Sequence, residues 1–98
     1  MSTLVVTSVD ARVDPAREED LLDGSRLMNA AEKPAGLLRS ELLRGHDGHW
    51  RIQTTWRDIE ALRAVRSSGG RPAALDLLDS IGAEHSHAVF TVEELFEG

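Results

Sequence analysis

The sequence predicts a single α+β domain of the ferredoxin-like split βαβ type, with the element order β-α-β-β-α-α-β. Its 98 residues suffice for one hydrophobic core and not for two. Short β-branched runs alternate along the chain with amphipathic segments. An alternating run that ends at Trp56 is followed at once by a capped helical segment that begins at Asp58. Because no linker or internal repeat divides the chain, we expect residues 1–98 to form one sandwich of a sheet and helices.

The composition is that of an ordinary globular protein, with 41% apolar and 29% charged residues. The net charge is −6 and the eleven basic residues form no dense run, so nucleic acid is not expected as a partner. The chain has no cysteine, which excludes disulfides and thiolate metal sites. The N-terminal residues show neither a basic region nor a long apolar stretch. We therefore expect no signal peptide, no membrane span and a cytoplasmic location.

The first third of the chain predicts a strand and then a helix. Residues 4–9 are an apolar, β-branched run that is typical of a strand buried on both faces. Asp14 and Pro15 read as a helix cap followed by proline at the first helical position, where its missing N–H does no harm. The predicted helix continues to about Ala31, although Gly24 within it costs about 1 kcal/mol relative to alanine.

The middle of the chain predicts a hairpin and a second helix. Residues 33–36 form a clear break. Residues 37–43 and 49–55 predict two strands, joined by a turn that has Asp-Gly at its exit. Asp58 then caps a helix whose apolar residues share one face, namely Ile59, Leu62 and Val65.

The last third predicts another helix and a long strand. Residues 67–71 interrupt the preceding helix, and residues 72–81 resume it until Gly82 stops it in a left-handed conformation. The final strand is predicted from residue 85 to about residue 95. This element order puts the helices on one face of the sheet only. We expect the other face to carry Val, Leu and Ile side chains, and therefore to be covered in a face-to-face homodimer.

Three loose motifs lie in a suggestive order along residues 4–96. They are Pro-x-Gly-Leu at residues 34–37, the strand-ending Trp56 with Glu-Ala-Leu at residues 60–62, and the aromatic-bearing strand at residues 89–92. In order and spacing they resemble the antibiotic biosynthesis monooxygenase family. The resemblance implies a dimeric α+β barrel in which the last strand leans on the partner. The family includes cofactor-independent oxygenases that turn anthrone-like or hydroquinone-like polyketides into quinones, haem degraders, and proteins without assigned activity.

Carried over residue by residue, the resemblance is incomplete. Trp56 matches the tryptophan of both the oxygenases and the haem degraders. The oxygenases pair it with an asparagine at the position of Ile52 here. The haem degraders place an axial histidine at the position of Arg66, and an asparagine where Thr7 and Ser8 lie. Trp56 alone is present among the two groups expected of the oxygenases and the three expected of the haem degraders, so the fold carries over more safely than the chemistry.

The candidate site residues have alternative interpretations. Trp56 shares a strand face with Ile52 and Thr54, and its ring either flanks a flat substrate or belongs to the plain core. Ile52 would form the apolar wall of a pocket, and Arg66 or His87 would stabilise a substrate anion. Residues 67–70 are either a lid or a mobile loop, with a solvated basic rim formed by three flanking arginines, Arg63, Arg66 and Arg71.

His85 and His87 lie two apart on one strand face, a spacing that can chelate a metal. Without a fixed third ligand they are better explained as polar residues near the start of a strand, and His87 as a pocket residue. We expect no metal and no cofactor.

Three functions follow from these interpretations. The first is a cofactor-independent monooxygenase that binds a small aromatic or quinol-like substrate through Trp56 and Ile52. The second is a non-catalytic dimeric ligand-binding or stress-related protein of the same fold, which the apolar Ile52 favours. The third is a haem-binding or haem-degrading protein, against which Arg66 argues.

Overall fold

A computed structural model describes residues 3–68 and 73–98. The predicted order β-α-β-β-α-α-β is confirmed, with one short 3-10 turn added at Pro15–Arg17. The elements are β1 (Val5–Arg12), α1 (Glu18–Ala30), β2 (Leu37–Arg44), β3 (His49–Trp56), α2 (Ile59–Ser67), α3 (Ala73–Ser80) and β4 (Glu84–Thr91).

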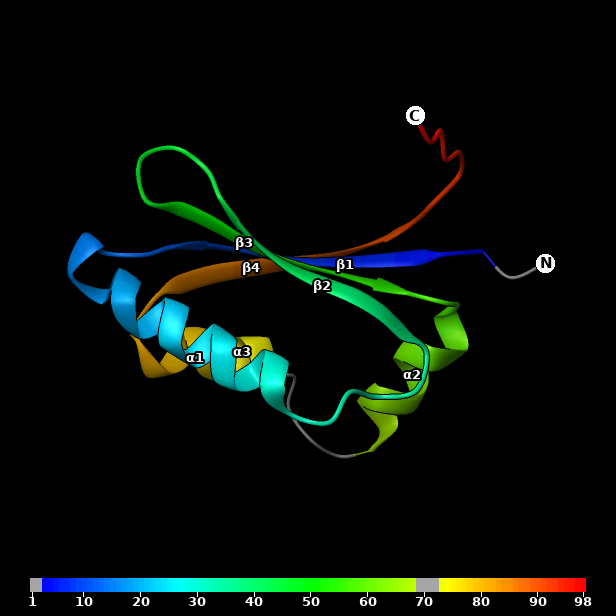
Figure 1. Cartoon of the computed structure of the whole chain (residues 1–98), viewed down its shortest axis with the longest axis horizontal. Coiled ribbons are helices and arrows are strands. Elements are labelled where there is room, and N and C mark those ends of the chain that lie inside the picture. The colour runs from blue at the N-terminus through cyan, green and yellow to red at the C-terminus, as the bar shows by residue number, and fades with distance from the viewer. Residues whose placement is uncertain (1–2, 69–72) are drawn as a thin grey trace.

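The four strands form one antiparallel sheet in the order β2-β3-β1-β4. Figure 1 shows all three helices on one face of this sheet, with α1 beside α3 and α2 set apart toward the other end. The opposite face is not covered by any helix of the described chain. This is the predicted ferredoxin-like arrangement. None of the helices in residues 3–68 and 73–98 is long and apolar enough to cross a membrane.

The core is divided into two groups of buried side chains. The larger group lies under α1 and α3 and consists of Ala11, Val13, Leu21, Trp50, Ile52, Leu78 and Ile81. The smaller group lies under α2 and consists of Val5, Trp56, Ala61 and Leu62. Since α2 stands apart from the other two helices, α1 and α3 cover the larger group and α2 covers the smaller one.

Local capping follows the sequence prediction closely. The Asp14 carboxylate accepts a hydrogen bond of 2.9 Å from the backbone N–H of Ala16, but it caps the 3-10 turn, and α1 begins only at Glu18. Asp58 accepts a bond of 2.9 Å from the N–H of Ala61 and caps α2, which lowers the pKa of Asp58 below its ordinary value.

Gly24 marks a close approach between two helices. A Cβ atom at this position would lie 2.2 Å from Cδ1 of Leu77 in α3. Packing of α1 against α3 therefore accounts for a residue that is intrinsically unfavourable inside a helix.

Two predicted strand boundaries are wrong. β1 continues past Val9 to Arg12. On its second face Ser8 is buried, but Val6 and Asp10 are only partly buried and Arg12 is exposed, so that face is not fully buried. β4 ends at Thr91 rather than near Leu95. The last pairing bond joins the N–H of Val92 to the carbonyl of Leu4, and the chain then turns away from the sheet (Figure 1).

The uncovered face is more polar than expected. The strand register places Val6, Leu43 and Phe90 there, so part of the expected Val, Leu and Ile surface is present, whereas Ile52 faces the helices, as expected for a pocket wall. Between them lie polar side chains, among them Ser8, Asp10, Arg39, Glu41, Arg51 and Gln53. The homodimer stays a prediction, and a partner would have to match polar groups as well as apolar ones.

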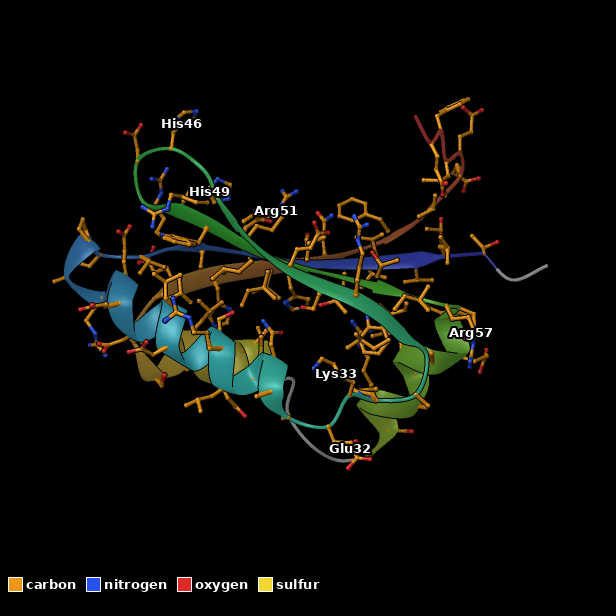
Figure 2. The ribbon with its side chains drawn as sticks, in the orientation of Figure 1. Glu32, Lys33, His46, His49, Arg51 and Arg57 are labelled. Carbon is orange, nitrogen blue, oxygen red and sulfur yellow. The ribbon has the colours of Figure 1, made fainter. Side chains whose placement is uncertain are left out.

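Asp10 is the centre of a charge cluster on this face. Its Oδ1 atom accepts a bond of 2.9 Å from Nε of Arg51 and lies 2.7 Å from Nε2 of His49. Figure 2 shows His49 and Arg51 along the same strand, away from the helices. The hydrogen bond from Arg51, assisted by His49, holds the pKa of Asp10 below its ordinary value of 3.8.

We predict that Asp10→Asn lowers the free energy of unfolding by about 1 kcal/mol at neutral pH. The wild-type advantage is complete above the ordinary carboxyl pKa and disappears as the pH falls through the lowered pKa of folded Asp10. Urea unfolding of both proteins between pH 7 and pH 3 measures this. Asp23→Asn, in an exposed pair with Arg26, is the control and should change stability little. A pH-independent difference at Asp10 would contradict the electrostatic assignment.

We also predict that Gly36→Ala destabilises the fold more than Gly82→Ala. Both glycines have a left-handed backbone, with φ of 85° and 70°, so alanine costs about 1–2 kcal/mol at each. At Gly36 the new Cβ would also lie 2.4 Å from Cβ of Ala61, whereas nothing lies within 4 Å at Gly82. Thermal unfolding should therefore show a clearly larger loss for Gly36→Ala, and equal losses would rule out the close packing of α2 on this turn.

Candidate functional site

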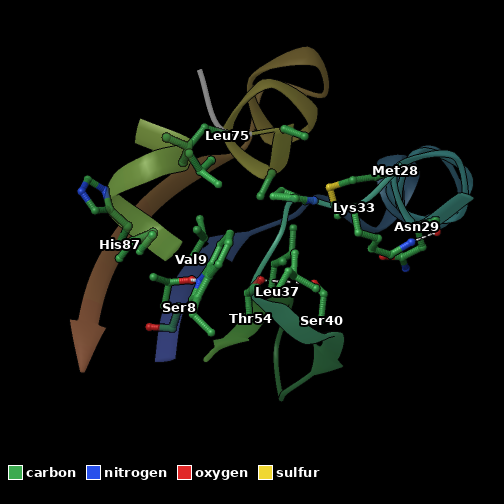
Figure 3. A pocket seen from close by; sticks show the side chains of 18 of the residues that line it. Ser8, Val9, Met28, Asn29, Lys33, Leu37, Ser40, Thr54, Leu75 and His87 are labelled. Atoms are coloured by element: carbon green, nitrogen blue, oxygen red, sulfur yellow. Dashed lines mark hydrogen bonds between the residues drawn. The ribbon is translucent and has the colours of Figure 1, made fainter. Parts of the chain in front are cut away.

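A cavity of about 680 Å³ opens on the helix-covered face of the sheet. Its lining comes from all four strands and all three helices (Figure 3). The four predicted site residues, Ile52, Trp56, Arg66 and His87, all line it. Ile52 belongs to the larger core group and Trp56 to the smaller one, so the cavity lies between them. Its volume is within the range of about 300–1,000 Å³ that is usual for small-molecule sites.

Trp56 is both a core residue and a wall of the cavity. Only 6% of its surface is exposed, and it packs with Val5, Ala61 and Leu62. Its indole N–H donates a hydrogen bond of 3.1 Å to Oγ1 of Thr7. Trp56 can therefore belong to the core and flank a flat substrate at the same time. A ligand that contacts Trp56 would meet its apolar ring, because the polar edge is already paired.

Ile52 is 4% exposed and forms part of the apolar lining. Across the sheet it faces Val9, and Val9 in turn faces His87 on β4. These three residues make one row of the cavity floor, which is apolar except at its β4 end.

Arg66 and His87 are exposed side chains that line the cavity from α2 and β4. His87 lies at the margin of the cavity in Figure 3. Arg66 can bring positive charge and His87 an imidazole to a bound ligand without being buried themselves, so polar groups lie at the rim of the cavity. Gly69 and Gly70 of the predicted lid, and the flanking Arg71, lie outside the described residues.

The histidines of β4 do not gather into a metal site. Nε2 of His85 lies 2.8 Å from Oδ1 of Asp79, at the end of α3. Within residues 3–68 and 73–98, no three histidine or acidic side chains lie close enough together to hold a metal ion.

Several polar lining groups were not predicted from the sequence. Ser40 and Thr54 approach each other to 3.2 Å between their hydroxyl oxygens, and Thr7 meets Trp56. Lys33 lies where the chain leaves α1 (Figures 2 and 3), and its ammonium donates to the carbonyl oxygens of Asn29 and Ala31 at the end of that helix. The alternation of β3 placed Thr54 beside Trp56, but its partners depend on pairing with distant strands.

Comparison with known proteins supports the fold. No protein-family model matches the sequence, and no curated protein matches it significantly. Solved structures do match over nearly the whole chain. A mutant of SnoaB, a cofactor-independent oxygenase from Streptomyces nogalater, shares 21% identity, with a TM-score of 0.68 over 97% of this chain and 98% of that one.

Two further structures are similar. A candidate antibiotic biosynthesis monooxygenase from Deinococcus radiodurans has 15% identity and a TM-score of 0.74, and the match covers 95% of this chain and 96% of that chain. A haem-degrading protein from Mycobacterium tuberculosis has 24% identity and a TM-score of 0.67, with both chains covered completely. At these identities the likeness concerns the backbone arrangement. The chain therefore has the ferredoxin-like α+β fold of solved antibiotic biosynthesis monooxygenases.

Proposed function

We propose that the protein is a cofactor-independent monooxygenase that acts on a small aromatic or quinol-like molecule. One observation carries this proposal: Trp56, Ile52, Arg66 and His87, which lie on three different elements, all line a single cavity. The similarity in fold to the oxygenase SnoaB supports it. A homodimer that covers the open sheet face and a cytoplasmic location belong to the same proposal.

The cavity suits a flat apolar ring. Trp56 offers the face or edge of its indole, and Ile52 offers an aliphatic wall beside it. Aromatic rings favour offset or edge-to-face contacts of this kind, and both residues are held by the core. Such a rigid wall positions the reacting carbon of a substrate without the help of a polar partner at residue 52.

The chemistry would begin with transfer of a proton from the substrate to water, and this proton returns when oxygen is reduced. Arg66 by its positive charge, or His87 by a hydrogen bond, stabilises the resulting enolate or phenolate at the rim. The anion then donates an electron to O₂. For an anthrone-like substrate the CH₂ group becomes C=O, one oxygen atom enters the product, and the other leaves as water with the two hydrogens. Oxygen is the only oxidant that this balance requires.

A non-catalytic ligand-binding or stress-related protein is the second candidate. The paired indole N–H of Trp56 and the apolar Ile52 both favour it, because neither offers a free polar group to the reacting centre. This candidate predicts that an aromatic ligand binds tightly and is recovered unaltered in air.

Our first functional prediction concerns oxygen uptake. Metal-stripped protein should consume O₂ with a panel of anthrones and hydroquinones above the spontaneous rate, and Trp56→Phe should lower kcat/KM about tenfold because the ring wall becomes smaller. Trp50→Phe is the matched control, since Trp50 is a buried core tryptophan that does not line the cavity. Equal rates for Trp56→Phe and wild type, with circular dichroism showing both folded, would remove the assigned role of Trp56.

Our second functional prediction concerns haem. A guanidinium does not serve as an axial haem ligand, so Arg66 cannot take the role of the histidine that the haem degraders have at this position. Titration with haemin should therefore give no protein-bound Soret band. His87, the one histidine among the described lining residues, is the side chain to test if a band appears. A band that appears with wild type and disappears in His87→Ala would reverse the ranking and favour a haem protein.

A further inference from the structure

Three hydroxyl side chains form a single row across the floor of the cavity. In the strand register Thr7 on β1 faces Thr54 on β3, and Thr54 faces Ser40 on β2. All three line the cavity and are partly buried. Neighbouring strands lie about 4.8 Å apart, and the side chains of Ser40 and Thr54 lean together until their oxygens are 3.2 Å apart.

The row is bounded by apolar residues on both sides. Trp56 and Val5 lie in the row of paired residues next to it in one direction, and Ile52 and Val9 in the other. The floor therefore consists of a polar strip between two apolar strips. A flat ring that rests on the apolar strips would bring its edge or its substituents over the hydroxyl groups.

The hydroxyl groups retain hydrogen-bonding capacity toward a ligand. Thr7 accepts from the indole N–H of Trp56, and no acceptor for its own hydrogen is found among the described residues. Ser40 and Thr54 share one hydrogen bond of 3.2 Å, so one of them donates to the other and the second keeps its hydrogen free. The row thus offers two hydroxyl donors to the space above it.

We propose that the hydroxyl row of Thr7, Thr54 and Ser40 binds oxygen atoms along one edge of a planar ligand. It would select an oxygenated ring, such as a phenol or quinone, over a hydrocarbon ring of the same shape. This inference rests on the proposed function, since it concerns the same cavity and the same class of ring.

The selection has a clear physical cause. A hydrocarbon ring would displace water from the cavity and leave the free hydroxyl donors without partners, which is costly in an apolar site. An oxygenated ring replaces the lost water with its own acceptors. Sites built to hydrogen-bond a ligand oxygen discriminate against the analogue that lacks it more strongly than apolar pockets discriminate by size. The hydroxyl row therefore selects for oxygen atoms on the ligand, whereas Trp56 and Ile52 select only for its flat shape.

The test compares two probes, 1-naphthol and 1-methylnaphthalene, which differ in a hydroxyl against a methyl group. Their affinities are measured by calorimetry or NMR titration under nitrogen. We expect wild type to bind 1-naphthol about tenfold more tightly than 1-methylnaphthalene. Thr54→Val replaces the central hydroxyl with a methyl group and leaves only Thr7 and Ser40 as donors, at the two ends of the row, so this preference should fall. Thr54→Ser keeps the hydroxyl and should restore it.

Thr55→Val is the matched control. Thr55 pairs with Val6 and Arg39 on the uncovered face, so the same chemical change on the same strand should leave both affinities unaltered. Ser40→Ala provides a second probe of the row and should weaken 1-naphthol selectively. If circular dichroism shows that Thr54→Val does not fold, Ser40→Ala replaces it as the variant that tests the proposal.

The outcomes separate this inference from the function on which it rests. If wild type binds both probes equally, or if the preference survives both Thr54→Val and Ser40→Ala, the hydroxyl row is not the specificity element and the ring-binding cavity still stands. If neither probe binds wild type, the ring-binding site and the hydroxyl row are both overturned. A reduced preference in Thr54→Val and its return to the wild-type value in Thr54→Ser support the row.

Discussion

The pairing of β1 with β3 is the constraint on which the rest of the structure depends. It sets Val5 opposite Trp56, Thr7 opposite Thr54 and Val9 opposite Ile52, so that aromatic, hydroxyl and aliphatic rows lie side by side on one face. A slip of one residue would turn every side chain of a strand to the other face. The buried tryptophan and isoleucine hold the register against such a slip, and the same register builds the cavity floor.

The site depends on the separation of α2 from α1 and α3. α1 and α3 pack closely, as the contact at Gly24 shows, whereas α2 covers Trp56 and its neighbours separately. A single continuous helical layer would have closed the space between the two core groups. The fold therefore keeps its small core stable in two parts and leaves an apolar cavity between them, with charged side chains at its rim.

The candidate site could be predicted in part. The alternation of β3 put Trp56 and Ile52 on one face, and the need to stabilise a substrate anion suggested Arg66 and His87, all of which line the cavity. The partners of these residues could not be predicted. The bond from Trp56 to Thr7 and the contact of Thr54 with Ser40 join residues that are 49 and 14 positions apart, and no local pattern carries such pairings.

The sequence by itself determined the element order, the capping role of Asp14 at the turn before α1 and the helix cap at Asp58, because capping and periodicity act within a few residues. The left-handed stop at Gly82 is local in the same way. Only the tertiary structure decided how far β1 and β4 extend and which face is polar. Strand ends and strand faces are set by the neighbouring strands, and the antiparallel register that aligns them arises only when distant segments pair.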